Sequence, residues 1–291
     1  MRWILTLLFC SASLFTWAQE DLLSLLGEEE ETLYATASFK TNRVVNLHSL
    51  ENTAAGVLDI KISHRFGFVN QGAYELFGLD NATIRIGADL GISDALMVGF
   101  GRSSFEKTYD AFAKLKLLRQ SSGKRNTPFT VAAFASVALK SLRFENPDRE
   151  NFFSSRLSYA GQLIIGRKFS EGFTFQLSPT VIHRNLVATT DEKNDVFAIG
   201  AAFRQKLTNR LSINAEYIYV PPGQLLDGFE NSFSIGFDIE TGGHVFQLHF
   251  TNSTAMIEKG FVAETVGDWF EGDIHFGFNI SRVFTVWDRE R

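Results

Sequence analysis

Apolar and polar side chains alternate along two neighbouring stretches of the chain, residues 58–66 and 83–92. In the second stretch, for example, Ile84 and Ile86 flank Arg85. A β-strand sends successive side chains to opposite faces, so each stretch predicts a strand with one apolar and one charged face. Each apolar face runs for about ten residues, enough for a tilted strand to cross a bilayer. The pattern therefore predicts strands that meet lipid on one side and water on the other.

The alternation recurs to the end of the chain and predicts an all-β fold, a transmembrane antiparallel up-and-down β-barrel of about 12 strands. The predicted strands span residues 56–66, 82–92, 95–102, 107–118, 128–141, 157–169, 172–184, 195–207, 210–220, 231–240, 243–252 and 270–284. The alternative is a soluble β-sandwich or lipocalin-like barrel, which would bury its apolar faces inside.

The predicted connections are sorted by length. Tight turns with Gly, Asn and Asp lie at residues 93–94, 170–172, 208–209 and 241–243, and longer links alternate with them. Outer-membrane barrels have short periplasmic turns and long outer loops, so we expect every one of these tight turns on the periplasmic side. A sandwich has no reason to sort its loops in this way. Two connections break the rule: 103–106 is unexpectedly short and 120–127 unexpectedly long, and the sequence offers no physical reason.

Parity along each strand divides the side chains into two sets. The outward set is apolar and includes Phe173, Phe175, Leu177, Tyr217, Tyr219, Phe233, Ile235, Phe237, Phe246, Leu248, Phe250, Phe276 and Phe278. The inward candidates for lining the lumen are Asp59, Lys61, Arg65, Arg85, Asp89, Lys114, Lys116, Lys140, Glu216, Asp238, His249, Asp273 and His275. Opposite charges either pair across a narrow lumen, where an unpaired charge is costly, or line an aqueous channel. Barrels of about twelve strands are intermediate in width between filled eight-stranded barrels and open porins, so the strand number does not decide between the two alternatives.

Composition narrows the class of protein. The chain has 291 residues, a net charge of −5 and 45% hydrophobic residues. The acidic balance argues against a nucleic-acid partner, which would favour a basic patch. The mean hydropathy of −0.02 resembles that of a soluble protein. A barrel gives the same average, because half of each strand faces water.

Residues 1–18 have the form of a secretory signal peptide, with Arg2 before an apolar core that ends at a small residue, Ala18. Cleavage would remove Cys10, the single cysteine of the chain, which excludes disulfides and thiolate chemistry afterwards. Residues 19–54 would then form an N-terminal segment and residues 55–291 the barrel.

The N-terminal segment has two parts. The acidic run at residues 28–31 indicates a solvated periplasmic tail or a docking peptide for a periplasmic protein. Residues 32–54 alternate weakly and either lie along the periplasmic rim or insert into the lumen as a plug. In the second case Lys40, Arg43 and His48 are the plug candidates, and Lys40 and Arg43 would pair with wall carboxylates such as Asp89, Glu216 or Asp238.

Two kinds of chemistry were weighed. His249, Asp273 and His275 share inward parity on consecutive strands and could bind a metal or relay protons, although a polar lumen lining explains them equally well. A lipid hydrolase would need Ser and His together on the outer face, but His64 and Ser63 have opposite parity. We therefore predict no enzyme activity, no cofactor and no metal site.

Several short sequence motifs are more specific than the alternation that all such barrels share. They are ASFKTNR at Ala37–Arg43, ISHRFG at Ile62–Gly67, FGLDNA at Phe77–Ala82, GRSS at Gly101–Ser104 with KTYD at Lys107–Asp110, FQLHFTNS at Phe246–Ser253 and GDIHFGFNISR at Gly272–Arg282. Together, in order and spacing, they resemble the Gram-negative outer-membrane family catalogued as a membrane-bound β-barrel domain of unknown function. The resemblance covers about residues 33–286 and implies a barrel in contact with outer-membrane lipid. It carries over no catalytic residue, because the family has no assigned reaction.

Two classes of function remain. One is a channel for small solutes. The other is a structural barrel with a closed lumen that anchors or positions a periplasmic partner. An aqueous lumen would favour the channel, whereas a lumen filled by residues 32–54 would favour the closed barrel. The sequence slightly favours the channel over the closed barrel.

Overall fold

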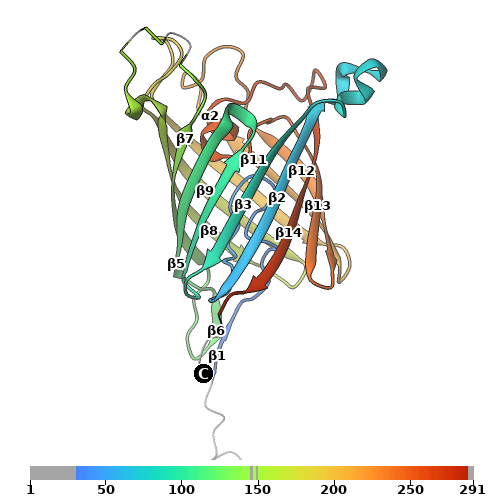
Figure 1. Cartoon of the computed structure of the whole chain (residues 1–291). Helices are drawn as coiled ribbons and strands as arrows, with labels where there is room; N and C mark the ends of the chain where they lie inside the picture. The colour runs from blue at the N-terminus through green and yellow to red at the C-terminus, as the bar shows by residue number, and fades with distance from the viewer. Residues whose placement is uncertain (1–30, 145–146, 149, 288–291) are drawn as a thin grey trace, which may run out of the picture.

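The computed structural model describes residues 31–144, 147–148 and 150–287. Within these residues twelve antiparallel strands close into a barrel (Figure 1). The strands are β2 (Val57–Phe68), β3 (Ala82–Gly91), β4 (Leu96–Ser103), β5 (Thr108–Leu118), β7 (Thr130–Lys140), β8 (Leu157–Lys168), β9 (Phe173–Arg184), β10 (Asp195–Lys206), β11 (Leu211–Tyr219), β12 (Phe233–Thr241), β13 (His244–Thr251) and β14 (His275–Thr285). Each strand pairs with the next along the chain, and β14 pairs with β2 to close the ring. The predicted up-and-down barrel is confirmed.

The predicted strand positions agree with the structure except at the last strand, which was expected from residue 270. It begins at His275, because residues 268–273 form a turn. In that turn the N–H of Phe270 donates to the Asp268 carboxylate at 2.7 Å and the N–H of Asp273 donates to the Asp268 carbonyl at 2.9 Å. The hydrogen bond to the Asp268 side chain therefore stabilises a turn where the alternation predicts a strand.

Alternation along the strands separates a polar interior from an apolar exterior. On β9, Gln176 and Ser178 are fully buried while Leu177 between them is 41% exposed. Large apolar side chains such as Phe237 and Phe250 are likewise exposed on the outside. A soluble barrel would have the opposite arrangement, so this wall is built for lipid outside and polar groups inside.

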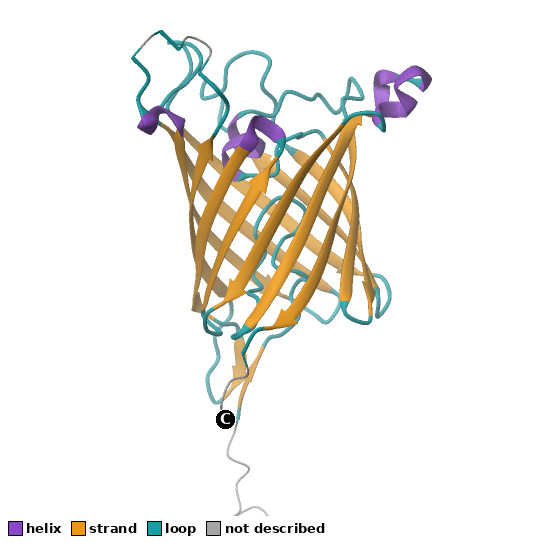
Figure 2. Cartoon of the chain, viewed as in Figure 1, coloured by secondary structure: helices purple, strands orange, loops and turns teal. Residues whose placement is uncertain are grey.

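The two ends of the barrel differ. We call the end where the described chain begins and ends the near end, and the opposite end the far end (Figure 1). Tight turns join the strands at the near end, whereas the far end carries long loops with the short helices η1 (Val69–Gln71), η2 (Ala73–Gly78), η4 (Phe153–Arg156) and α2 (Glu258–Ala263) (Figure 2). Among the described residues, no helix has the length and apolar character needed to cross a membrane.

The structure explains both irregular connections. The long near-end link after β5 contains β6 (Ser121–Gly123), which pairs with β1 (Thr32–Tyr34) in a two-stranded sheet below the barrel. That link is long because it holds the N-terminal strand. The short far-end link after β4 turns through η3 (Phe105–Lys107), in which Glu106 and Lys107 have positive φ values of 51° and 48°.

After β1 the chain enters the barrel and folds inside it before it joins β2, as the blue loop between the strands shows (Figure 1). Residues 41–50 are all buried. The predicted signal peptide, residues 1–18, and the acidic run at 28–30 lie outside the described residues.

The lipid-facing exterior leads to a stability prediction. Phe237→Arg places a charge on the outer face of β12, where Phe237 is 43% exposed. Near the bilayer midplane this should lower the free energy of unfolding by roughly 2–4 kcal/mol. Phe270→Arg is the matched control, because Phe270 is 101% exposed on a far-end loop. Urea unfolding in lipid vesicles measures both, and equal losses would contradict the assignment of the outer face.

Candidate channel interior

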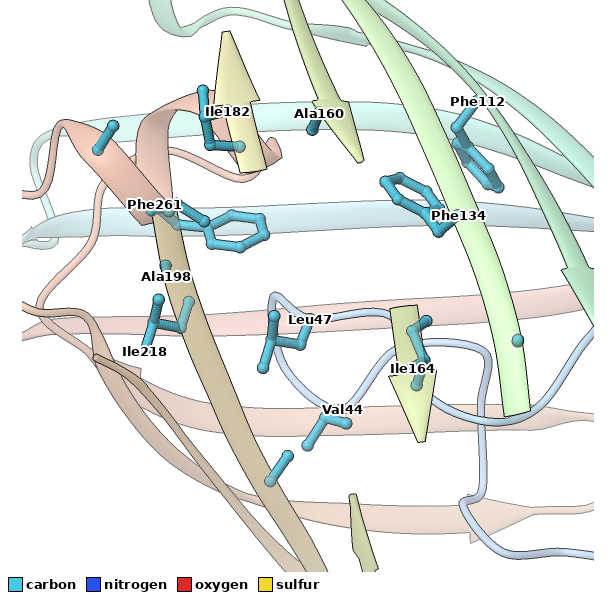
Figure 3. Close-up of a cluster of buried hydrophobic side chains, with 14 of the residues drawn as sticks. Val44, Leu47, Phe112, Phe134, Ala160, Ile164, Ile182, Ala198, Ile218 and Phe261 are labelled. Carbon is cyan, nitrogen blue, oxygen red and sulfur yellow. The ribbon is translucent and has the colours of Figure 1, made fainter. Parts of the chain in front are cut away.

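The inserted segment, residues 37–54, forms a narrow hairpin inside the barrel. Arg43 and His48 form an antiparallel bridge, and the N–H of Val44 donates to the Leu47 carbonyl at 2.8 Å. Figure 3 shows Val44 and Leu47 directed at the inner faces of the strands. The tip of the hairpin, residues 45–46, therefore presents its backbone to the barrel wall.

A single carboxylate receives this tip. The N–H groups of Val45, Asn46 and Leu47 donate to Glu216 on β11 at 3.1, 2.8 and 3.0 Å. Successive N–H groups that converge in this way form a nest that favours an anion, and hydrogen bonds to a charged group are stronger than neutral ones. Glu216 is 2% exposed, so these donors are its main compensation for burial.

Polar side chains from five other strands form further hydrogen bonds with the hairpin. The guanidinium of Arg65 donates to the Asn46 side chain at 3.0 Å, and Lys114 donates to the Ser49 carbonyl at 3.1 Å. The remaining amide donors are Gln176 to the His48 carbonyl, Gln247 to the Val44 carbonyl and Asn279 to the Val45 carbonyl. The wall thus replaces the water that these backbone groups would otherwise bind.

Apolar contacts complete the fit on one side. Leu47 and Leu50 are each 1% exposed and belong to the same buried cluster as Ile164. A Cβ at Gly200 on β10 would come within 2.8 Å of a Leu47 methyl group. A glycine at this inward position therefore leaves the space that Leu47 occupies.

Opposite charges pair within the wall itself. Arg85 on β3 forms an ion pair with Asp110 on β5. Lys61 lies 3.7 Å from Asp59 and 4.0 Å from Asp89. These pairs follow the first of the two arrangements considered from sequence, in which inward charges compensate one another.

The predicted lumen residues fall into three groups. Ten are buried inside the barrel: Asp59, Lys61, Arg65, Arg85, Asp89, Lys114, Glu216, Asp238, His249 and His275. Lys116 lies near the near-end rim, 4.0 Å from Glu51, and Lys140 lies at the far-end rim beside Glu106. Asp273 does not line the lumen, because it lies in the turn before β14 and accepts a hydrogen bond from Asn70 at 2.6 Å.

The His249, Asp273 and His275 group is consequently not assembled. His275 is held by the Phe66 carbonyl at 2.7 Å and by the Thr254 hydroxyl at 2.8 Å. No three metal-ligating side chains come together in the described part of the chain.

The partners expected for the plug candidates were wrong. Lys40 pairs with Glu240 near the rim, and Arg43 pairs with Glu258 at 3.2 Å. Neither plug cation reaches the three wall carboxylates. The Asn42 amide bonds Asp89 beside wall Lys61, the Gln247 amide bonds Asp238, and backbone N–H groups bond Glu216. The side chains of Lys40 and Arg43 extend to other carboxylates, so amide and backbone donors bond the three predicted ones.

A second segment, in the long link between the strands predicted at 243–252 and 270–284, also folds into the barrel. Helix α2 is buried, with Phe261 0% exposed, and Figure 3 shows Phe261 beside Ile182, Ala198 and Ile218. The apolar residues 255–257 and 261–263 within this loop were the signal that could have indicated burial.

The two inserted segments meet through Glu258. Its carboxylate pairs with Arg43 and lies 3.6 Å from His48 Nε2. His48 belongs to no membrane-spanning strand, and burial, reinforced by Arg43, holds its pKa well below the usual range. The imidazole is therefore neutral, and Arg43 is the cationic partner of Glu258.

This architecture is that of a membrane-embedded barrel of the outer-membrane type, with an apolar exterior and a polar, occupied interior. The chain belongs to the family described as Membrane bound beta barrel domain (DUF5777), whose model matches residues 39–284. The matched range includes the inserted segment from Phe39 onward, so this segment is part of the family's domain.

Solved structures with a similar barrel include three outer-membrane proteins. The NanC porin is 7% identical, with a TM-score of 0.48 over 78% of this chain and 98% of that one. The KdgM porin is 8% identical, with a TM-score of 0.47 over 78% and 99%. The COG4313 outer membrane channel from Pseudomonas putida F1 is 12% identical, with a TM-score of 0.48 over 82% and 100%. No curated protein matches the chain. At such identities these likenesses say nothing about what the chain binds or transports.

The Glu216 nest leads to the second prediction. Glu216→Gln keeps the size but leaves one acceptor oxygen for three N–H donors, which should destabilise the inserted hairpin by about 1–3 kcal/mol. Trypsin should then cleave after Arg43 faster, while the barrel stays folded. Gln162→Leu is the control: Gln162 is an inward residue on β8 whose amide has no partner among the described residues. Equal cleavage rates in both variants would contradict the role of Glu216.

Proposed function

We propose that this protein is an outer-membrane channel for small solutes and that residues 37–54 close it as a removable plug. The observation that carries the proposal is the chemistry of the contact between the hairpin and the wall. Glu216, Arg65 and Lys114 meet the hairpin through hydrogen bonds rather than apolar packing.

A permanently filled barrel does not require charged residues on the inner face of its wall. Replacing buried charges by apolar residues of similar volume is often neutral or stabilising, so a fixed core would be expected to lose them. In a channel the same side chains are useful, because water hydrates them once the plug leaves. Wall atoms with no protein partner in the described chain, such as both ring nitrogens of His249, also favour a lumen that admits water.

The alternative is a closed barrel that positions a periplasmic partner. A filled lumen fits this function as well, and β1 lies outside the barrel, where a partner protein can reach it. The two functions differ in whether release of the hairpin opens a path for ions.

The proposal includes export by residues 1–18, removal of that segment, and a near end that faces the periplasm. A periplasmic protein that binds near β1 would act directly on the plug. No catalytic step, cofactor or nucleic acid takes part.

Conductance in planar bilayers tests the channel. The chain from residue 19 onward should be nearly silent, and a chain lacking residues 19–54 should conduct steadily. Gly200→Val in the full chain should raise the open fraction, because the added methyl groups displace Leu47. Ala201→Val is the matched control, since its side chain points to lipid from the same strand. Silence of all four proteins would favour the closed anchoring barrel and end the channel proposal.

Cysteine labelling tests the orientation. A cysteine at Asn185, in a far-end loop, should react with a membrane-impermeant reagent on intact cells. A cysteine at Asn209, in a near-end turn, should react only after the cells are opened. Reaction of Asn209→Cys but not Asn185→Cys on intact cells would invert the orientation.

A further inference from the structure

The far end of the barrel carries a pocket of about 590 Å³ that the plug does not occupy. It lies among the far ends of β5, β7, β8 and β9 and the segment that follows α2. Pockets of about 300–1,000 Å³ hold small organic ligands. Phe105, Leu186 and Phe229 give part of the lining an apolar surface.

The charged lining is predominantly cationic. It consists of Lys140, Arg143, Arg156, Arg184 and Lys259 and the carboxylates Glu106, Glu192 and Glu264. Five cations face three carboxylates, which leaves an excess of two positive charges. The pocket is therefore positive in a protein whose net charge is −5.

The three carboxylates are already engaged. Glu106 pairs with Lys140 and with Lys259, the latter at 2.9 Å. Glu264 pairs with Lys259 at 3.0 Å and with Arg184 at 3.1 Å, and Glu192 pairs with Arg184 at 3.1 Å.

The pairing of Glu106 with Lys259 favours the charged form of both side chains. Burial alone would raise the pKa of Glu106, but Lys259 and Lys140 outweigh it and lower the pKa. Burial likewise opposes the charge of Lys259, yet Glu264 and Glu106 raise its pKa. Because Lys140, Arg184 and Lys259 pair with the three carboxylates, the excess positive charge lies on Arg143 and Arg156.

Two buried polar atoms of the lining have no partner in the described protein. They are the hydroxyl of Thr108, a residue 2% exposed, and Nε of Arg184, a residue 3% exposed. A buried donor without an acceptor costs about 1–3 kcal/mol, and a ligand that supplies an acceptor relieves that cost.

We propose that this pocket binds a small organic anion that carries hydroxyl groups beside a carboxylate or phosphate. The anionic group accepts a hydrogen bond from Nε of Arg184, and Arg143 and Arg156 supply the excess positive charge. The Thr108 hydroxyl bonds a ligand oxygen, and the apolar face of the ligand covers Phe105 and Leu186. The inference goes beyond the proposed channel, because binding at the far end does not require the lumen to open.

Isothermal titration calorimetry on the full chain in detergent tests the site with three probes: glucuronate, glucose 6-phosphate and glucose. At least one of the two anions should bind on the order of tenfold more tightly than glucose, and the preference between them distinguishes carboxylate from phosphate. Equal affinity for all three, or saturable binding of none, would overturn the proposal.

Variants locate the binding. Thr108→Val keeps the shape and removes no bond within the described protein, so it should weaken the preferred anion by about tenfold without loss of stability. Thr83→Val removes another buried hydroxyl that lies outside the pocket lining and should leave affinity unchanged. Arg184→Lys keeps the charge but loses the Nε donor and should also weaken binding. Wild-type affinity in Thr108→Val, or equal loss in Thr83→Val, would rule out this site. Calorimetry measures binding and not conductance. The pocket proposal and the channel proposal can therefore fail independently of each other.

Discussion

The structure depends on one constraint: in lipid, every backbone N–H and C=O must be hydrogen-bonded within the protein. Twelve strands meet it by closing into a ring in which β14 pairs with β2. Closure leaves no strand edge open, and the alternation of side chains then forces half of them inward. The exterior must be apolar, so the polar residues of the sequence collect in the lumen.

A polar lumen of this size has to be hydrated or occupied, and the chain supplies two occupants. Residues 37–54 enter from the near end and α2 enters from the far end, and they join at the Arg43–Glu258 ion pair. The near-end segment is held mainly by polar groups of the wall. The far-end segment is held by Phe261 against Ile182 and its neighbours. The two occupants therefore differ in character: polar groups of the wall hold the first, whereas apolar contacts hold the second against β8 and β9.

The sequence was sufficient for the barrel because strand periodicity is local. Alternation locates a strand without knowledge of its neighbours, and it failed only where the Asp268 side chain imposed a turn before β14. The interior was much less predictable. Glu216 binds backbone groups 169 to 171 residues away, and no local pattern in either segment indicates that contact. Parity correctly places Glu216 inside but cannot say what it meets. The same limit explains the wrong partners for Lys40 and Arg43, whereas the apolar residues 255–257 and 261–263 could have indicated the burial of α2.

The small sheet of β1 and β6 has a kinetic consequence. It fixes the hairpin's N-terminal end outside the barrel, and the direct continuation into β2 fixes the other end. The hairpin can therefore leave the lumen only as a tethered loop. Its return is an intramolecular event with an effective concentration on the order of millimolar, whatever the abundance of the protein. In the proposed channel, a force that opens the barrel would therefore have to persist, because closure would follow as soon as it ended.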